Sequence, residues 1–134
     1  MVKMQRKTIL VAAWVALLWN LFLVLGATLN VESILPRVAG GGYDSIPLGL
    51  RFVYGIQTLL VVFQFFFLAR LYERNGAWSK NSYLITRIFL ILSALSTLVN
   101  SVSRSSLERW NAIAAVVITL AFYVLGNIKT KPTQ

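Results

Sequence analysis

Four stretches of mostly apolar residues, separated by shorter polar segments, dominate the pattern of the chain. They cover residues 8–26, 52–71, 83–102 and 111–126. A helix that crosses the hydrocarbon core of a bilayer needs about 20 such residues, so the first three stretches are long enough and the fourth is short. The pattern predicts an all-α protein, a four-helix transmembrane bundle, in which residues 1–134 form a single integral membrane domain.

The composition agrees with this prediction. Of the 134 residues, 57% are hydrophobic and only 13% are charged, whereas an ordinary soluble domain has about 25% charged residues. A chain of this size buries too little of its surface to hide so many apolar side chains from water. The formal net charge of +9 is scattered over short loops, which indicates contact with membrane lipids and argues against nucleic acid as a partner.

Lys and Arg residues are distributed unequally over the segments between the stretches. Nine lie near the N-terminus, around the second polar segment or in the C-terminal tail: Lys3, Arg6, Lys7, Arg70, Arg74, Lys80, Arg87, Lys129 and Lys131. The other four are Arg37, Arg51, Arg104 and Arg109. Because cytoplasmic segments carry the excess of Lys and Arg, we predict that both termini are cytoplasmic. The segment 27–51, with Gly40–Gly42 at its centre, is then a longer Gly-rich extracytoplasmic loop.

Polar side chains within the apolar stretches recur at helical spacing. They form what we call the polar seam: Asn20, Gln57, Gln64, Ser93, Ser96, Thr97 and Asn100. Residues three, four or seven apart share one face of a helix, so these faces are expected to meet inside the bundle. One interpretation is packing, since hydroxyls and amides join transmembrane helices by hydrogen bonds. The other is a pathway or a binding pocket for a lipid or a small neutral solute.

The second stretch carries an unusual number of aromatic rings, and others lie near the predicted membrane surface. We expect any partner to contact Phe63, Phe66 or Phe67, whether that partner is a larger membrane protein complex, a second copy of the chain, a carotenoid or a quinone. The alternative is that these rings contact only lipid tails. Candidates for contact with lipid headgroups are Arg87, Arg109, Trp78 and Trp110.

The residues that usually carry catalysis are scarce. The chain contains no His and no Cys, and its four acids, Glu32, Asp44, Glu73 and Glu108, fall in the polar segments or next to them. No titratable group or activated nucleophile is therefore expected at membrane depth. The sequence predicts a protein that is not an enzyme and that carries no metal or cofactor. The leading hypothesis is an accessory or structural subunit that binds lipids and a larger membrane complex or itself, and the alternative is a small transporter or channel.

Two short segments carry a resemblance to known proteins. One is Leu25-Gly26-Ala27-Thr28-Leu29 before the Gly-rich loop, and the other is the segment from Asn100 to Trp110, NSVSRSSLERW. With the four-stretch plan, they make the chain similar to small four-helix integral membrane proteins of unassigned function that are common in bacteria, actinobacteria especially. The resemblance implies the architecture and the bacterial cytoplasmic membrane as location, and it implies no activity.

Overall fold

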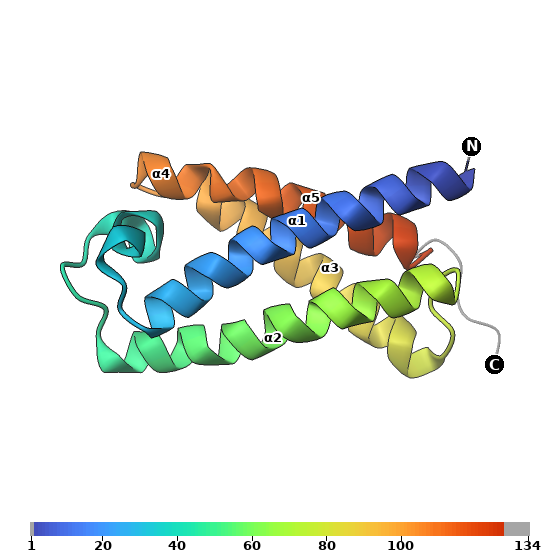
Figure 1. The fold of residues 1–134 in the computed structure, drawn as a ribbon, viewed down its shortest axis with the longest axis horizontal. Helices are drawn as coiled ribbons and strands as arrows, with labels where there is room; N and C mark the ends of the chain where they lie inside the picture. Colours follow the sequence, from blue (N-terminus) through green and yellow to red (C-terminus); the bar gives the residue numbers. More distant parts are fainter. Residues whose placement is uncertain (1, 128–134) are drawn as a thin grey trace.

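The computed structural model describes residues 2–127, and every regular element in this range is helical (Figure 1). The elements are α1 (Val2–Thr28), the 3-10 helices η1 (Glu32–Arg37) and η2 (Ala39–Gly41), α2 (Leu48–Glu73), α3 (Lys80–Ser101), α4 (Ser106–Arg109) and α5 (Asn111–Leu125). Four segments of the described range are long and apolar enough to cross a membrane, namely 3–28, 48–73, 80–101 and 106–125. The predicted four long apolar helices are confirmed, and Lys129 and Lys131 lie outside the described residues.

The helices extend beyond the predicted apolar stretches. α1 already includes the basic residues at the start of the chain. The last stretch looked short because its first turn is polar. In the structure α4 leads through Trp110 directly into α5, so that together they form a segment of 20 residues, long enough to cross a membrane. Ser105 caps this segment, since its hydroxyl oxygen accepts a hydrogen bond of 3.2 Å from the Glu108 amide, as expected for a serine before a helix.

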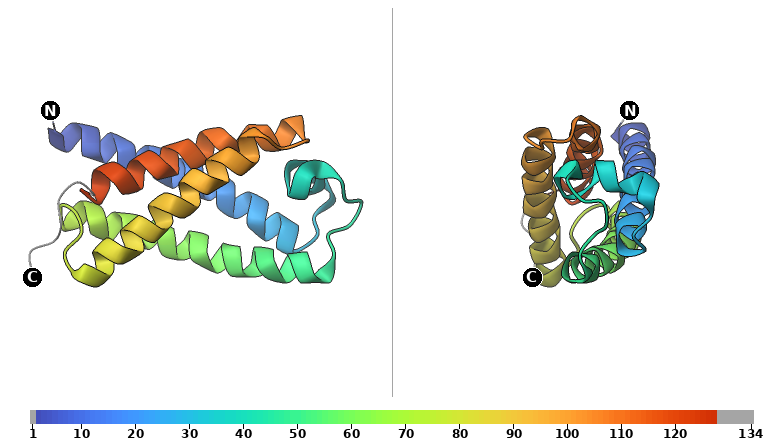
Figure 2. Two further views of the ribbon diagram at one scale, coloured as in Figure 1. Left: turned by 180° about the vertical axis from the view of Figure 1, so that it is seen from behind. Right: turned by 90° about the vertical axis from the view of Figure 1, so that its left-hand side faces the viewer.

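The order of the long helices around the bundle differs from their order in the sequence. α1 packs against α2 and α5, and α3 packs against α5 (Figure 2). α2 and α3 are joined by a short turn at Asn75 and Gly76, both with positive φ, yet their backbones hardly approach each other beyond it. We call the end with the start of α1 and this turn the terminal end, and the end with η1, η2 and α4 the long-loop end (Figure 1).

The long loop between α1 and α2 is folded against the helix ends. Ile34 and Leu35 of η1 are buried together with Leu23 and Ala27 of α1. A Cβ atom at Gly26 would lie only 2.6 Å from Ile34 Cγ1, so glycine allows η1 to approach α1 closely. The Gly-rich centre forms a tight turn, with φ of 75° at Gly40 and 68° at Gly41, and η2 contacts η1 and α4.

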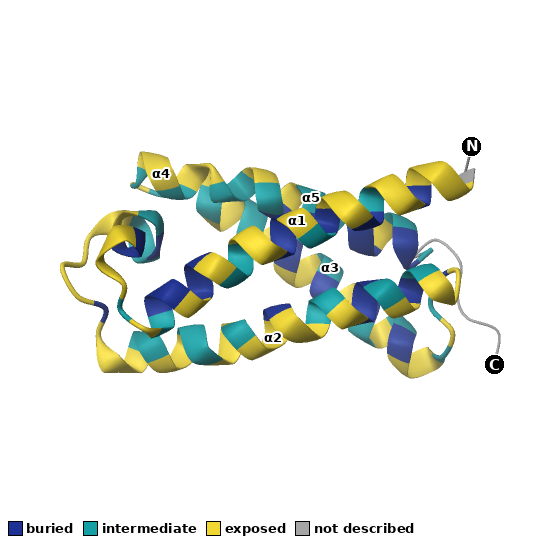
Figure 3. Ribbon diagram, in the orientation of Figure 1, coloured by how far each residue is buried: buried dark blue, intermediate teal, exposed yellow. Residues whose placement is uncertain are grey.

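The largest aromatic cluster fills the bundle towards its terminal end. Its rings come from α2, α3, α5 and the turn between α2 and α3: Phe63, Phe67, Trp78, Phe89 and Phe122. The buried Phe89 and Phe122 stack with centroids 5.4 Å apart, and Phe67 lies 6.5 Å from Phe122. Phe67, which we expected as a possible contact for a partner, is only 6% exposed, so little of this residue is open to one. It shares its helix face with Leu71, which is buried in the same core, and the buried positions of α2 gather towards its terminal end (Figure 3).

Arg6 ties three helices together at the terminal end. The residue is only 8% exposed. Its guanidinium donates hydrogen bonds to the carbonyls of Leu71, Val124 and Leu125 at 3.2–3.4 Å. These carbonyls belong to the last turns of α2 and α5, where the helix itself offers few backbone donors. Those of Leu71 and Val124 also accept from the amides of Gly76 and Asn127. A cation there is also favoured by the negative end of each helix dipole. Arg6 therefore satisfies the ends of two helices from a third.

Candidate lipid crevice

A cavity of about 280 Å³ lies where α2 and α3 fail to pack against each other. Asn20 of α1, Gln57 and Gln64 of α2, and Ser93 and Ser96 of α3 line it. Ala115 and Ile118 of α5, both buried, form its inner wall. The structure thus brings together five of the seven residues of the polar seam. They come from three helices and face one space.

A second cavity of about 200 Å³ continues from the first towards the long-loop end. The two share Asn20, Gln57 and Ser96, and the second adds Asn100, Arg37, Glu108 and Asn111. We call the two cavities together the crevice. Thr97, the remaining residue of the seam, lines neither of them. At the opposite end the crevice stops at Phe89 of the aromatic cluster.

The polar groups of the crevice fall into two classes. Those of α3 bond along their own helix: Ser93 Oγ donates to the Phe89 carbonyl at 2.7 Å, and Asn100 Nδ2 donates to the Ser96 carbonyl at 2.8 Å. The side-chain amides of Asn20, Gln57 and Gln64 make no hydrogen bond with any residue that the structure describes. The seam residues therefore do not join the helices by direct hydrogen bonds, and three amides face the crevice unpaired.

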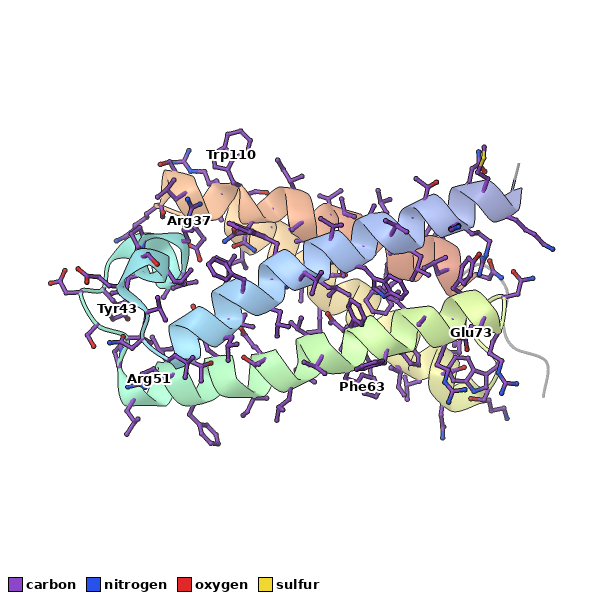
Figure 4. All side chains as sticks on the ribbon, viewed as in Figure 1. Arg37, Tyr43, Arg51, Phe63, Glu73 and Trp110 are labelled. Atoms are coloured by element: carbon purple, nitrogen blue, oxygen red, sulfur yellow. The ribbon has the colours of Figure 1, made fainter. Side chains whose placement is uncertain are left out.

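The crevice has its mouth at the long-loop end. Hydrogen-bonded polar residues that the sequence did not predict line this mouth. Trp19 Nε1 donates to Asn111 Oδ1 at 3.2 Å, and Asn111 Nδ2 donates to the Arg37 carbonyl at 3.0 Å. The Arg37 guanidinium lies 5.7 Å from the centre of the Trp19 ring, between the long loop and α4 (Figure 4). Only the folding of the loop onto α1 and α5 brings these three residues together, so no spacing in the sequence indicated them.

Glu108 is the acidic residue that lines this mouth. Its Oε2 accepts a 2.9 Å hydrogen bond from the Gly40 amide and a second one from the Ser103 hydroxyl. Its Oε1 accepts none from the part of the chain that the structure describes. In the sequence Glu108 is explained by the positive end of the following helix. The structure gives it a further place, lining the same cavity as Arg37.

The other predicted contact residues lie on the outside of the bundle. Phe66 is 66% exposed and Phe63, which stacks on Phe67, is 47% exposed. Trp110 is exposed and projects away from the helices (Figure 4), and the exposed side chains of Arg109, Arg87 and Trp78 accompany it at the two ends. Arg87 lies over the Tyr83 ring. Within residues 2–127 no three acidic, His or Cys side chains gather as metal ligands would.

The chain matches no family model, no curated protein and no solved structure.

Proposed function

We propose that this protein is a non-catalytic integral membrane protein that binds a lipid in the crevice between α2 and α3. The observation that carries the proposal is the position of three unpaired amides, from Asn20, Gln57 and Gln64, along a cavity between two helices that would face the bilayer. An unpaired polar group in an apolar medium is costly. A ligand with ester carbonyls or hydroxyls removes this cost by hydrogen bonding.

The walls of the crevice suit the apolar part of the same ligand. Leu60 of α2 and Leu92 of α3 line the first cavity and are 41% and 47% exposed, so it is bordered by side chains that face outward. Val61 and Ile118 line it on the inside. A lipid chain can therefore lie against apolar side chains while the glycerol ester region lies against the amides. Such a mixed wall is typical of sites that fix an apolar ligand with a few polar groups.

The rival hypothesis is a transporter or channel for a neutral solute or lipid along the polar seam. It is supported by the same amides and by the length of the crevice. A solute that crossed the bundle would also have to pass the aromatic cluster, which fills the terminal half with stacked rings. Because the crevice ends at Phe89, a resident lipid needs no rearrangement of these rings and a pathway does.

The wider role that we propose is that of an accessory subunit in a bacterial cytoplasmic membrane, with both termini in the cytoplasm. The partner is a larger membrane complex, a second copy, a carotenoid or a quinone. The outward-facing residue that supports this role is Phe66. This ring borders an apolar groove of about 230 Å³ between α1 and α2, to which Leu18 and Leu21 also belong. Loss of a co-purifying partner on Phe66→Ala would support this role, and unchanged recovery would contradict it.

Lipid binding can be tested by counting the lipids that the purified protein retains in a mild detergent, using native mass spectrometry. The double variant Gln57→Leu with Gln64→Leu should bind the retained lipid about tenfold more weakly, because two membrane hydrogen bonds are lost. The matched control is Gln5→Leu, a glutamine that is exposed on α1 and lies outside the crevice. Equal retention by all three proteins would contradict the proposal, and glycerol flux into liposomes that Gln64→Leu abolishes would favour the transporter.

A further inference from the structure

The crevice changes its chemistry in one direction along its length. At the long-loop end it is lined by the charged Arg37 and Glu108. Its middle carries the amides of Asn20 and Gln57, which both cavities share. Its far end carries Phe89 together with Gln64, whose neighbour Phe63 contacts the Phe89 ring. The charges therefore lie at one end only, as the headgroup does in a phospholipid that enters the bilayer.

The two charged residues at the mouth do not pair with each other. Arg37 and Glu108 line one cavity but form no ion pair within the described residues. The Arg37 guanidinium contacts only the Trp19 ring there, and Glu108 keeps Oε1 without a hydrogen bond. A cation and an anion that are held in one small cavity without pairing match a ligand with both charges.

We infer that the crevice selects a phospholipid whose headgroup carries a phosphate and a primary ammonium, as in phosphatidylethanolamine. This inference rests on the proposed lipid binding and names the ligand class. The phosphate contacts the Arg37 guanidinium, which suits phosphate oxygens. The ammonium donates to Glu108 Oε1. The lipid belongs to the leaflet at the long-loop end, because its chains point from the mouth towards the middle of the bundle.

A primary ammonium fits this mouth better than the quaternary ammonium of a choline headgroup. Choline has no N–H to donate, so Glu108 Oε1 would stay unpaired next to it. Choline is usually bound on an open aromatic face, but the Arg37 guanidinium already lies over the Trp19 ring. A glycerol headgroup lacks the cation altogether. A diacylglycerol lacks both charges and keeps only the ester region that the amides contact.

The experiment compares four lipids with identical chains in binding to the purified wild-type protein: phosphatidylethanolamine, phosphatidylcholine, phosphatidylglycerol and diacylglycerol. Wild type should bind the ethanolamine lipid about tenfold more tightly than the choline and glycerol phospholipids, the effect of one hydrogen bond to a charged group. Diacylglycerol, which lacks both charged contacts, should bind more weakly still. Glu108→Gln should remove this preference. Arg37→Leu should weaken the binding of the three phospholipids and leave diacylglycerol unchanged. This comparison of headgroups on wild type requires no variant to fold.

Matched controls lie close by, and each outcome decides between the two proposals. Glu32→Gln on η1 and Arg104→Leu, both exposed and outside the cavity, should behave as wild type. Equal binding of all four lipids would overturn the headgroup inference and leave lipid binding intact, whereas no binding of any lipid would overturn the proposed function itself. Soluble phosphoethanolamine should not displace the lipid, and binding of this compound as tight as that of the lipid would show a site for a small zwitterion instead.

Discussion

The two ends of the bundle are built from the same four long helices but in opposite ways. At the terminal end the rings of Phe67, Phe89 and Phe122 fill the space between α2, α3 and α5, and Arg6 satisfies the last carbonyls of α2 and α5. At the long-loop end small and polar side chains such as Ser96 leave a crevice open. Stacked rings join α2, α3 and α5 in one half, and no such stack joins α2 to α3 in the other half of the described chain.

Because of this difference, we expect the terminal half to contribute most of the stability and the crevice half to contribute the binding site. Protein interiors are close-packed, so a helix pair that carries small residues and divergent axes leaves a space unless another group fills it. In the aromatic half a smaller side chain would leave a new cavity, whereas the crevice half already contains unfilled space between the described residues 2–127. Substitutions in the two halves should therefore differ in what they change, and three of them test this in order of expected size.

The largest effect is expected from Phe67→Ala. The ring is 6% exposed and contacts Phe89 and Phe122 at centroid distances of 6.3 and 6.5 Å. Removing it leaves a cavity and should lower the free energy of unfolding by about 3–5 kcal/mol, measured by denaturation in detergent micelles. The control is Phe66→Ala on the neighbouring position, 66% exposed, which should change the stability little. Equal losses for the two variants would show that the cluster is not the core of this half.

A smaller effect is expected from Arg6→Met, which keeps an unbranched side chain and removes the charge. The carbonyls of Leu71, Val124 and Leu125 lose their shared donor, and a hydrogen bond to a charged group contributes about 1.5–3 kcal/mol. We expect a loss of about 2–3 kcal/mol in the same unfolding measurement.

Lys7→Met serves as the control for Arg6→Met, because Lys7 is exposed on the same turn of α1 and should change little. If Arg6→Met and Lys7→Met unfold alike, the terminal end does not depend on the guanidinium.

The smallest effect on stability is expected from Gln64→Leu, in the crevice half. The amide has no hydrogen-bonding partner among the residues described, so its removal should change the free energy of unfolding by about 1 kcal/mol or less. Lipid retention should fall in the same preparation. A loss as large as that of Phe67→Ala would place Gln64 among the structural residues and remove the contrast between the two halves.

The sequence predicted what depends on local rules and missed what depends on distant contacts. Four apolar stretches predict four helices because a bilayer fixes their length, and Gln57 and Gln64, seven residues apart, share a face by helix geometry alone. The run around Phe67 has rings on all sides of the helix, so no periodicity tells which one is buried. The partners of Arg6 and Glu108 lie up to 121 and 68 residues away in the sequence, where no pattern links them.

The packing of α1 against α5 also has a consequence for how the chain assembles. α1 and α2 are consecutive neighbours, so they can pair as soon as both lie in the bilayer, in keeping with association of inserted helices. α3 follows next but has its main contacts with α5, so it lacks its principal partner until the last helix is made. The first helix of the chain then receives the last one, and Arg6 bonds to the end of α5. We expect a chain interrupted before α5 to leave α3 available to other membrane proteins and to quality control.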